Sequence, residues 1–258
     1  TIHHCLHYFS IVWCYYGDGV YEVFAKRLMG ANLHNLWAIK VIRYIPVLFV
    51  AGVLVAIIFY PGGNIHNAEQ IGYSFTHNFL SDLGGIRSHS GATNTISAFF
   101  FNFSMVIFGF GGIAFLFIPS LFKDNAVNYK LAIIGSAFLL FGALFFAGVG
   151  FTPHDLFRKE HVFFALNGFR LMVPAAILYF IVLVRSPVDN RYSWITMFFL
   201  LSTFAYVMYQ LFGGNAILDP QEMVRQATIQ KMISLVHIVS IFSLSFGFHQ
   251  QLELNNSK

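Results

Sequence analysis

The sequence predicts an all-α, polytopic transmembrane bundle of about six helices, and two observations lead to this prediction. Charged residues make up only 10% of the 258 residues, whereas hydrophobic residues make up 57% and aromatic residues 18%. Soluble domains usually carry roughly 25% charged residues, so the polar surface that water requires is missing. In addition, six apolar stretches approach the length of about 20 residues that a helix needs to cross the hydrocarbon core. Because lipid offers no partners to backbone polar groups, each stretch is expected to be helical.

The six predicted spans are separated by turn-forming segments such as PGG, KDN, TPHD, SPVDN and GGN. Together they define a transmembrane domain over residues 41–250, followed by a short tail over 251–258. Residues 1–40 contain no spanning stretch and are predicted to be an N-terminal cytoplasmic extension. Within it, we expect the natural start at Met29 and interpret residues 1–28 as an added, non-native segment. The predicted spans are 41–60, 95–121, 131–151, 162–184, 193–212 and 232–250.

The distribution of Lys and Arg predicts the orientation of the bundle. Nine of the 15 basic residues fall on the side of the termini, five fall on the other side, and Arg170 lies inside a span. The positive-inside rule therefore places both termini in the cytoplasm. The same scatter contains no basic stripe and no nucleic-acid-binding motif, so the net charge of +4 does not indicate a nucleic-acid partner. Membrane lipid is the partner that this composition predicts.

The first outer loop, residues 61–94, is too long to be a simple connection and contains the polar segment HNFLSDLGG. His77 and Ser81 are four residues apart, as are Asn78 and Asp82, so that each pair would share one helix face. We therefore expect a short helix at the bundle mouth, ended by the two glycines that follow. Its polar side chains would either point into the mouth as functional groups or cap and terminate a surface helix.

A second polar segment, FTPHDLFRKEH, follows the third predicted span. Asp155 is well placed to cap the next helix, and a catalytic or ligand-binding role is the alternative. His154 and His161 are seven residues apart, which is a rise of about 10 Å along one helix. They could therefore share a metal ion only if residues 154–158 form a loop.

Polar residues inside the predicted spans are costly in lipid and mark candidate sites. Arg170 would need a partner, for which Asp82 or Asp155 is available, and Asn167 would share its helix face. In the last span His237 belongs to a polar stripe that must face the bundle interior, where it would either complete a hydrogen bond or bind a ligand. The stripe consists of Gln230, Ser234, His237 and Ser240.

Several of these features resemble the domain-of-unknown-function 998 family of prokaryotic six-helix membrane proteins, and more distantly the Frag1/DRAM/Sfk1 group. The resemblance rests on FLSDLG (Phe79 to Gly84) and TPHD (Thr152 to Asp155), and covers roughly residues 40–250. It implies a six-helix bundle in a prokaryotic cytoplasmic membrane, without an assigned activity. A looser likeness is to membrane hydrolases of the alkaline ceramidase type, which use Ser, Asp and three His around zinc. The last span here lacks their HxxxH spacing.

Two functions follow from these observations. The first is a non-enzymatic membrane protein that binds a lipid or small amphiphile in a polar cavity at the outer face, or serves as an accessory subunit, without a cofactor. The alternative is a metal-dependent intramembrane hydrolase acting on a lipid, with zinc held among His77, His154, His161 and His237 and with Asp82 or Asp155 as general base. HExxH, GxSxG and phosphate-binding glycine motifs are absent. The predicted ligand-contacting residues are His77, Ser81, Asp82, His154, Asp155, Asn167, Arg170 and His237.

Overall fold

The structure, a computed structural model, describes residues 33–257 and confirms the predicted all-α bundle. Its described part contains six helices that are long and apolar enough to cross a membrane. The proposed start at Met29 and the segment 1–28 lie outside the described residues. In chain order the helices are a first helix Leu33–Phe59, α2 Thr95–Gly111, α3 Ala126–Phe151, α4 Arg158–Val184, α5 Asn190–Phe212 and α6 Pro220–Asn256. The second span continues past α2 through the 3-10 helices η2, Gly112–Leu116, and η3, Ile118–Phe122.

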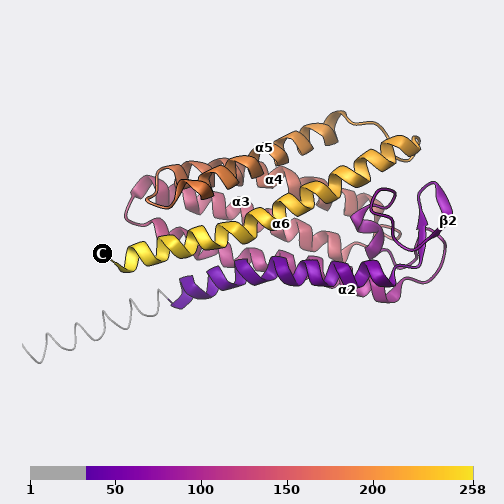
Figure 1. Ribbon diagram of the computed structural model, residues 1–258, viewed down its shortest axis with the longest axis horizontal. Helices are drawn as coiled ribbons and strands as arrows, with labels where there is room; N and C mark the ends of the chain where they lie inside the picture. The colour runs from indigo at the N-terminus through magenta and orange to yellow at the C-terminus, as the bar shows by residue number, and fades with distance from the viewer. Residues whose placement is uncertain (1–32, 258) are drawn as a thin grey trace, which may run out of the picture.

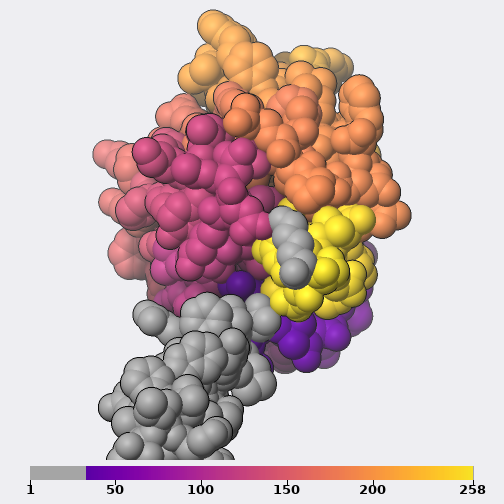
Figure 2. All heavy atoms as spheres, turned by 90° about the vertical axis from the view of Figure 1, so that its left-hand side faces the viewer, coloured from indigo at the N-terminus to yellow at the C-terminus, as the bar shows by residue number. Residues whose placement is uncertain are grey.

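The helices run roughly along one common axis (Figure 1). α3 packs against both α2 and α4, and α5 packs against both α4 and α6. Figure 2 shows the C-terminal end of α6, in yellow, between the first helix in indigo and α5 in orange. Phe248, Gln251 and Leu252 are accordingly buried. Buried residues occur along α6 from Glu222 to Leu252, so this helix packs against the bundle over most of its length.

Helix boundaries follow the capping residues more closely than the hydropathy. Asn125 accepts hydrogen bonds from the backbone N–H groups of the first turn of α3, and Asp219 does the same for α6 with Pro220 at its first position. As a result α6 begins twelve residues before the predicted span, because its cap and not its apolar run defines its start. The first helix is already formed at Leu33, before the predicted span that starts at residue 41.

Three loops, residues 60–94, 152–157 and 213–219, gather at one end of the bundle, which we call the mouth; the C-terminus lies at the other end (Figure 1). The first loop forms an antiparallel hairpin of β1, Gly62–Asn64, and β2, Asn67–Ile71, and then the 3-10 helix η1, Leu80–Gly84. The short helix was expected from the sequence, whereas the hairpin was not. That the mouth faces outward remains a prediction from the basic residues.

Candidate functional site

Asp82 is a buried acid at the mouth, with 3% of its surface exposed. Its Oδ2 accepts hydrogen bonds from the backbone N–H of Phe79 and from Nδ2 of Asn78, both at 3.0 Å. The bond to Phe79 caps the start of η1. The bond to Asn78 joins two residues four positions apart, which is the spacing noted in the sequence. Both bonds go to Oδ2, so Oδ1 is available for a contact with another residue.

η1 is held between α2 and α6, so the position of Asp82 is fixed by the bundle. From α6, Gln230 accepts a hydrogen bond from the N–H of Leu80, and Lys231 donates from Nζ to the carbonyl of Asn78. From the α2 side, amide and hydroxyl groups donate to the carbonyl groups at the end of η1. These donors are Asn94, Ser97 and Asn102.

His89 lies on the loop between η1 and α2, and its Nε2 is 3.3 Å from Oδ1 of Asp82. The adjacent Asp82 carboxylate raises the pKa of His89 above its ordinary value, although partial burial opposes this shift. The backbone of this loop packs against Gly63, where a Cβ atom would come within 2.3 Å of the N atom of Ser90. Gly63 also has a φ of +81°, so a glycine is needed there for two reasons.

His154 comes from the loop between α3 and α4 and faces the same group. Its ring centroid is 5.6 Å from that of His89. It lies so close to Gly85 that a Cβ atom there would be 2.5 Å from Cε1 of His154. Burial lowers the pKa of His154, and its Nδ1 is buried without a hydrogen-bond partner among the described residues.

The sequence suggested that Asp155 caps α4. It instead joins the loop between α3 and α4 to the loop that carries His89. Its two carboxylate oxygens accept hydrogen bonds from the backbone N–H groups of Ile86 and Arg87, both at 3.0 Å. The N-terminal cap position of α4 is Phe157, which makes no side-chain capping bond. The aspartate is therefore occupied by backbone donors and keeps His154 beside the loop that carries His89.

His161, in the first turn of α4, lies next to His154, with ring centroids 6.1 Å apart. Residues 152–157 form a turn rather than helix, and this satisfies the condition under which the two histidines could approach one another. Nδ1 of His161 is 2.6 Å from the carbonyl oxygen of Thr152. A carbonyl only accepts, so Nδ1 carries a proton, and in the neutral form of the ring Nε2 is an unprotonated acceptor.

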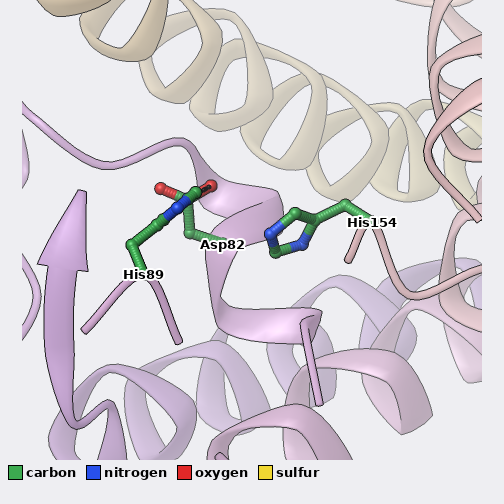
Figure 3. A group of neighbouring side chains, drawn as sticks. All are labelled: Asp82, His89 and His154. Carbon is green, nitrogen blue, oxygen red and sulfur yellow. Dashed lines mark ion pairs between the residues drawn. The ribbon is translucent and has the colours of Figure 1, made fainter. Parts of the chain in front are cut away.

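Asp82, His89 and His154 form one cluster, in which one potential ligand atom from each side chain lies within 4.8 Å of the others. Figure 3 shows the His89 ring beside the Asp82 carboxylate and the His154 ring turned toward both from the opposite side. Carboxylate and imidazole groups are ligands for zinc and other divalent transition metals. We refer to these three residues as the mouth cluster.

A cavity of about 950 Å³ opens beside the mouth cluster. Its polar end is lined by the three cluster residues together with Arg87 and Arg158, and it extends between α4 and α5 along apolar side chains. A smaller cavity of about 70 Å³ adjoins it deeper in the bundle and shares part of its wall. The shared residues are Ser81, His161, Ala165, Phe169 and Gln230.

His77, Asn167 and Arg170 lie apart from the mouth cluster. His77 is exposed and contacts Ser74 and Thr76, because η1 begins only at Leu80 and His77 precedes the helix that was expected to orient it. Arg170 is exposed on α4, and its Nη1 donates to Asn167 at 3.4 Å. In the described part of the chain it forms no ion pair with Asp82 or Asp155, since the outward face of α4 carries it away from the mouth.

His237 is buried deeper in α6, where the interior polar stripe was predicted. Its Nε2 is 2.8 Å from Oγ1 of Thr203, and that hydroxyl in turn donates to the carbonyl of Phe199. The rings of Phe169 and Phe199 both pack against its imidazole. The contacts match the hydrogen-bonding alternative for this residue and leave it outside the mouth cluster.

The sequence reasoning missed His89. It lies in the irregular part of the first outer loop, where no periodic pattern indicates which way a side chain points. Its only signal was a histidine seven residues after Asp82 in a polar loop, which is weak because the loop also holds His66 and His77.

Comparisons of the chain with protein-family models, with curated proteins and with solved structures found no match. The resemblance to the domain-of-unknown-function 998 family therefore rests on the two short motifs alone.

Proposed function

We propose that this integral membrane protein binds an amphiphilic lipid with an anionic head group at the mouth. The observation that supports the proposal best is the cavity of about 950 Å³, which is polar at the mouth and apolar between α4 and α5. Pockets for small organic ligands usually have volumes of roughly 300–1,000 Å³ and combine apolar walls with a few polar groups. An amphiphile matches such a division of chemistry within a membrane protein.

The charges at the polar end favour an anionic head group. Asp82 and Asp155 already accept hydrogen bonds from amide donors, so their negative charge is partly compensated. Arg158, in contrast, lines the cavity and forms no ion pair within the described residues. A guanidinium group offers planar, two-pronged donation to a phosphate or carboxylate. Arg158 is therefore the residue that we assign to the head group.

The apolar wall provides a place for a hydrocarbon tail. Val162, Leu166 and Phe169 of α4 line the cavity at spacings of four and three, so they occupy one helix face. Tyr206 of α5 lines the same space. Burying tail methylene groups there contributes about 0.8 kcal/mol each, although lipid surroundings already supply most of that gain. Selectivity would consequently come from the head group.

Lipid analysis of the purified full-length chain tests this proposal. We expect one class of anionic amphiphile to be enriched over its share in the source membrane. Arg158→Gln should lower that enrichment about fivefold or more, because a partly exposed ionic contact contributes about 1 kcal/mol. Lys159→Gln is the matched control, since it removes the same charge from the next position, outside the cavity lining. Equal enrichment in both variants, or no enrichment in the unaltered protein, would refute the proposal.

Blocking the apolar part of the cavity gives a second arm of the same test. Leu166→Trp would place an indole in the space between α4 and α5, whereas Leu201→Trp would add the same group on the exposed surface of α5. We expect only the first substitution to remove the bound amphiphile.

A metal-dependent hydrolase acting on the bound lipid is a second candidate, favoured by the position of the mouth cluster beside the same cavity. In that case Asp82, His89 and His154 would hold the metal, which would supply Lewis-acid activation of a water for hydrolysis of the lipid. Asp155 is engaged by two backbone amides, so His161, with its free Nε2, is the group available to accept the proton. Incubation with a membrane lipid extract, with and without a chelator, distinguishes the two functions: chelator-sensitive product formation indicates the hydrolase, and unchanged lipids indicate binding alone.

A further inference from the structure

The mouth cluster brings three potential metal ligands together from two loops that are far apart in the sequence. Their nearest ligand atoms all lie within 4.8 Å of one another. In a tetrahedral zinc site with bonds of about 2.0–2.2 Å, ligand atoms are about 3.3–3.6 Å apart. Asp82 and His89 already stand at 3.3 Å. Small rotations of the histidine side chains would thus close the group around one ion.

The surroundings of Asp82 are those of a ligand oriented in advance. One oxygen is fixed by two donors, Asn78 and the N–H of Phe79, and the other faces the histidines. Metal-binding carboxylates are commonly held by such neighbouring hydrogen bonds. A carboxylate buried to this degree also needs a positive partner, which a divalent cation would supply in addition to the contact with His89.

His154 provides an independent indication of a missing partner. Its Nδ1 is buried and has no hydrogen-bond partner in the described part of the protein. A buried polar atom left alone costs roughly 1–3 kcal/mol, and such atoms usually indicate a bound water or ion.

We propose that Asp82, His89 and His154 bind one divalent transition-metal ion, with zinc the best match to the ligands. Three protein ligands leave at least one coordination position for water or for a bound small molecule. This is the arrangement of catalytic zinc sites, whereas structural zinc sites have four protein ligands. All three residues line the large cavity, so that the open position faces it. Two histidines and one carboxylate also bind iron(II), and metal analysis separates the two ions. The site does not rest on the amphiphile proposal, because it uses neither Arg158 nor the apolar wall.

The test uses the full-length protein in mild detergent. The protein is stripped with a chelator, zinc is titrated in competition with a chromophoric indicator, and cobalt(II) is added in parallel for its absorption spectrum. Elemental analysis of protein purified without chelator shows whether zinc or iron is the native ion. We expect one metal ion per chain and a cobalt spectrum typical of four or five ligands.

His89→Ala and His154→Ala should each weaken zinc binding at least about 100-fold, because a lost ligand costs more than a lost outer contact, which typically costs 10–100-fold. His77→Ala is the matched control: it removes a histidine from the same loop, but from an exposed position outside the cluster. Zinc binding that is absent from the unaltered protein, or equally tight in all three variants, would overturn the proposal.

A second measurement tests the proposal even if the His89 and His154 variants do not fold. Zinc should raise the unfolding temperature of the unaltered, chelator-stripped protein in a concentration-dependent way, because a ligand that binds only the folded state stabilises it by mass action. The same increase should appear in the His77→Ala variant. If zinc at 100 times its indicator-derived Kd leaves the unfolding temperature unchanged, the bound ion is not in a folded site and the proposal fails.

Discussion

The Asp155 carboxylate accepts a hydrogen bond from the backbone N–H of Arg87 at 3.0 Å, although the two residues are 68 positions apart. Its other oxygen accepts from the N–H of Ile86 at the same distance. This pair of bonds is the direct link between the loop that carries His89 and the loop that carries His154. The geometry of the mouth cluster consequently depends on a residue that is not part of it.

Asp155→Ala should therefore loosen the mouth without unfolding the bundle. We expect zinc affinity to fall about tenfold, because the two histidines are no longer held at a fixed separation, and backbone N–H groups 86 and 87 to exchange faster with solvent. Zinc titration and hydrogen exchange measure the two effects. Glu160→Ala, which removes an exposed acid from the first turn of α4, is the control and should change neither.

Gly85→Ala tests the close approach of His154 to η1. A methyl group at this position would lie 2.5 Å from Cε1 of the ring, so that the ring or the helix must move. We expect a destabilisation of about 1–3 kcal/mol together with weaker zinc binding. Gly91→Ala offers the contrast: its φ of +83° makes the substitution strained, but open space surrounds it, so zinc affinity should stay unchanged. Similar zinc affinities for both variants would contradict the expected crowding.

Lys231→Met tests how α6 fixes η1. Nζ of this buried lysine donates to the carbonyls of Asn78 and Ala227, and the methionine keeps the side-chain volume while leaving the Asn78 carbonyl without this donor. We expect a loss of about 1–3 kcal/mol in the free energy of unfolding, measured by thermal denaturation in detergent. Lys159→Met, at an exposed position, should cost less than 0.5 kcal/mol, as surface substitutions usually do. A cost as small for Lys231→Met would show that η1 is held by its other contacts.

The sequence predicted the helices because crossing a membrane imposes a minimum length of apolar residues. The helix ends were harder to place, since they depend on capping residues such as Asp219 and not on hydropathy. Proline and the capping aspartate together start α6 well before its apolar run. The first helix extends beyond its predicted span for a related reason: residues near the membrane surface continue a helix without being strongly apolar.

The site was predicted only in part, for reasons that follow from its construction. Asp82 and His154 were recognised as polar residues at the ends of apolar stretches, where their cost in lipid makes them conspicuous. His89 was not, because a loop has no periodicity and its approach to Asp82 depends on the hairpin and on Asp155. Arg170 was expected to pair inward, but the sequence alone does not show which face of an apolar helix meets its neighbours.

The stability of the metal-free protein should depend on pH in opposite ways through His89 and His154. The pKa of His89 is raised by Asp82, so its contribution is fully present below the ordinary value of 6.5 and is lost as the pH rises through the folded-state pKa. The pKa of His154 is lowered by burial, so its contribution is lost as the pH falls below 6.5. Two further charges act on His89 in opposite directions: Arg158 lowers its pKa and Asp155 raises it.

Thermal unfolding in the presence of a chelator, recorded across this pH range, measures both contributions. In His89→Gln the decline of stability above pH 6.5 should be reduced, while the decline on the acidic side remains. His77→Gln, from the same loop but outside the cluster, should reproduce the profile of the unaltered protein. An unchanged alkaline decline in His89→Gln would show that the contact with Asp82 does not stabilise the fold.

His237→Ala separates a structural histidine from the metal-binding ones. α6 begins at Pro220, so His237, 17 residues further along the helix, lies several turns below the mouth. Its Nε2 contacts Oγ1 of Thr203. Because that hydroxyl donates to the carbonyl of Phe199, the histidine must be the donor in their contact, so Nε2 carries a proton and has no lone pair to offer a metal. Removing the ring also leaves a void between Phe169 and Phe199. We therefore expect a loss of about 2–4 kcal/mol in stability with unchanged zinc stoichiometry. The reverse result, normal stability with loss of zinc, would move the metal site from the mouth into the bundle and would contradict the assignment of Asp82, His89 and His154.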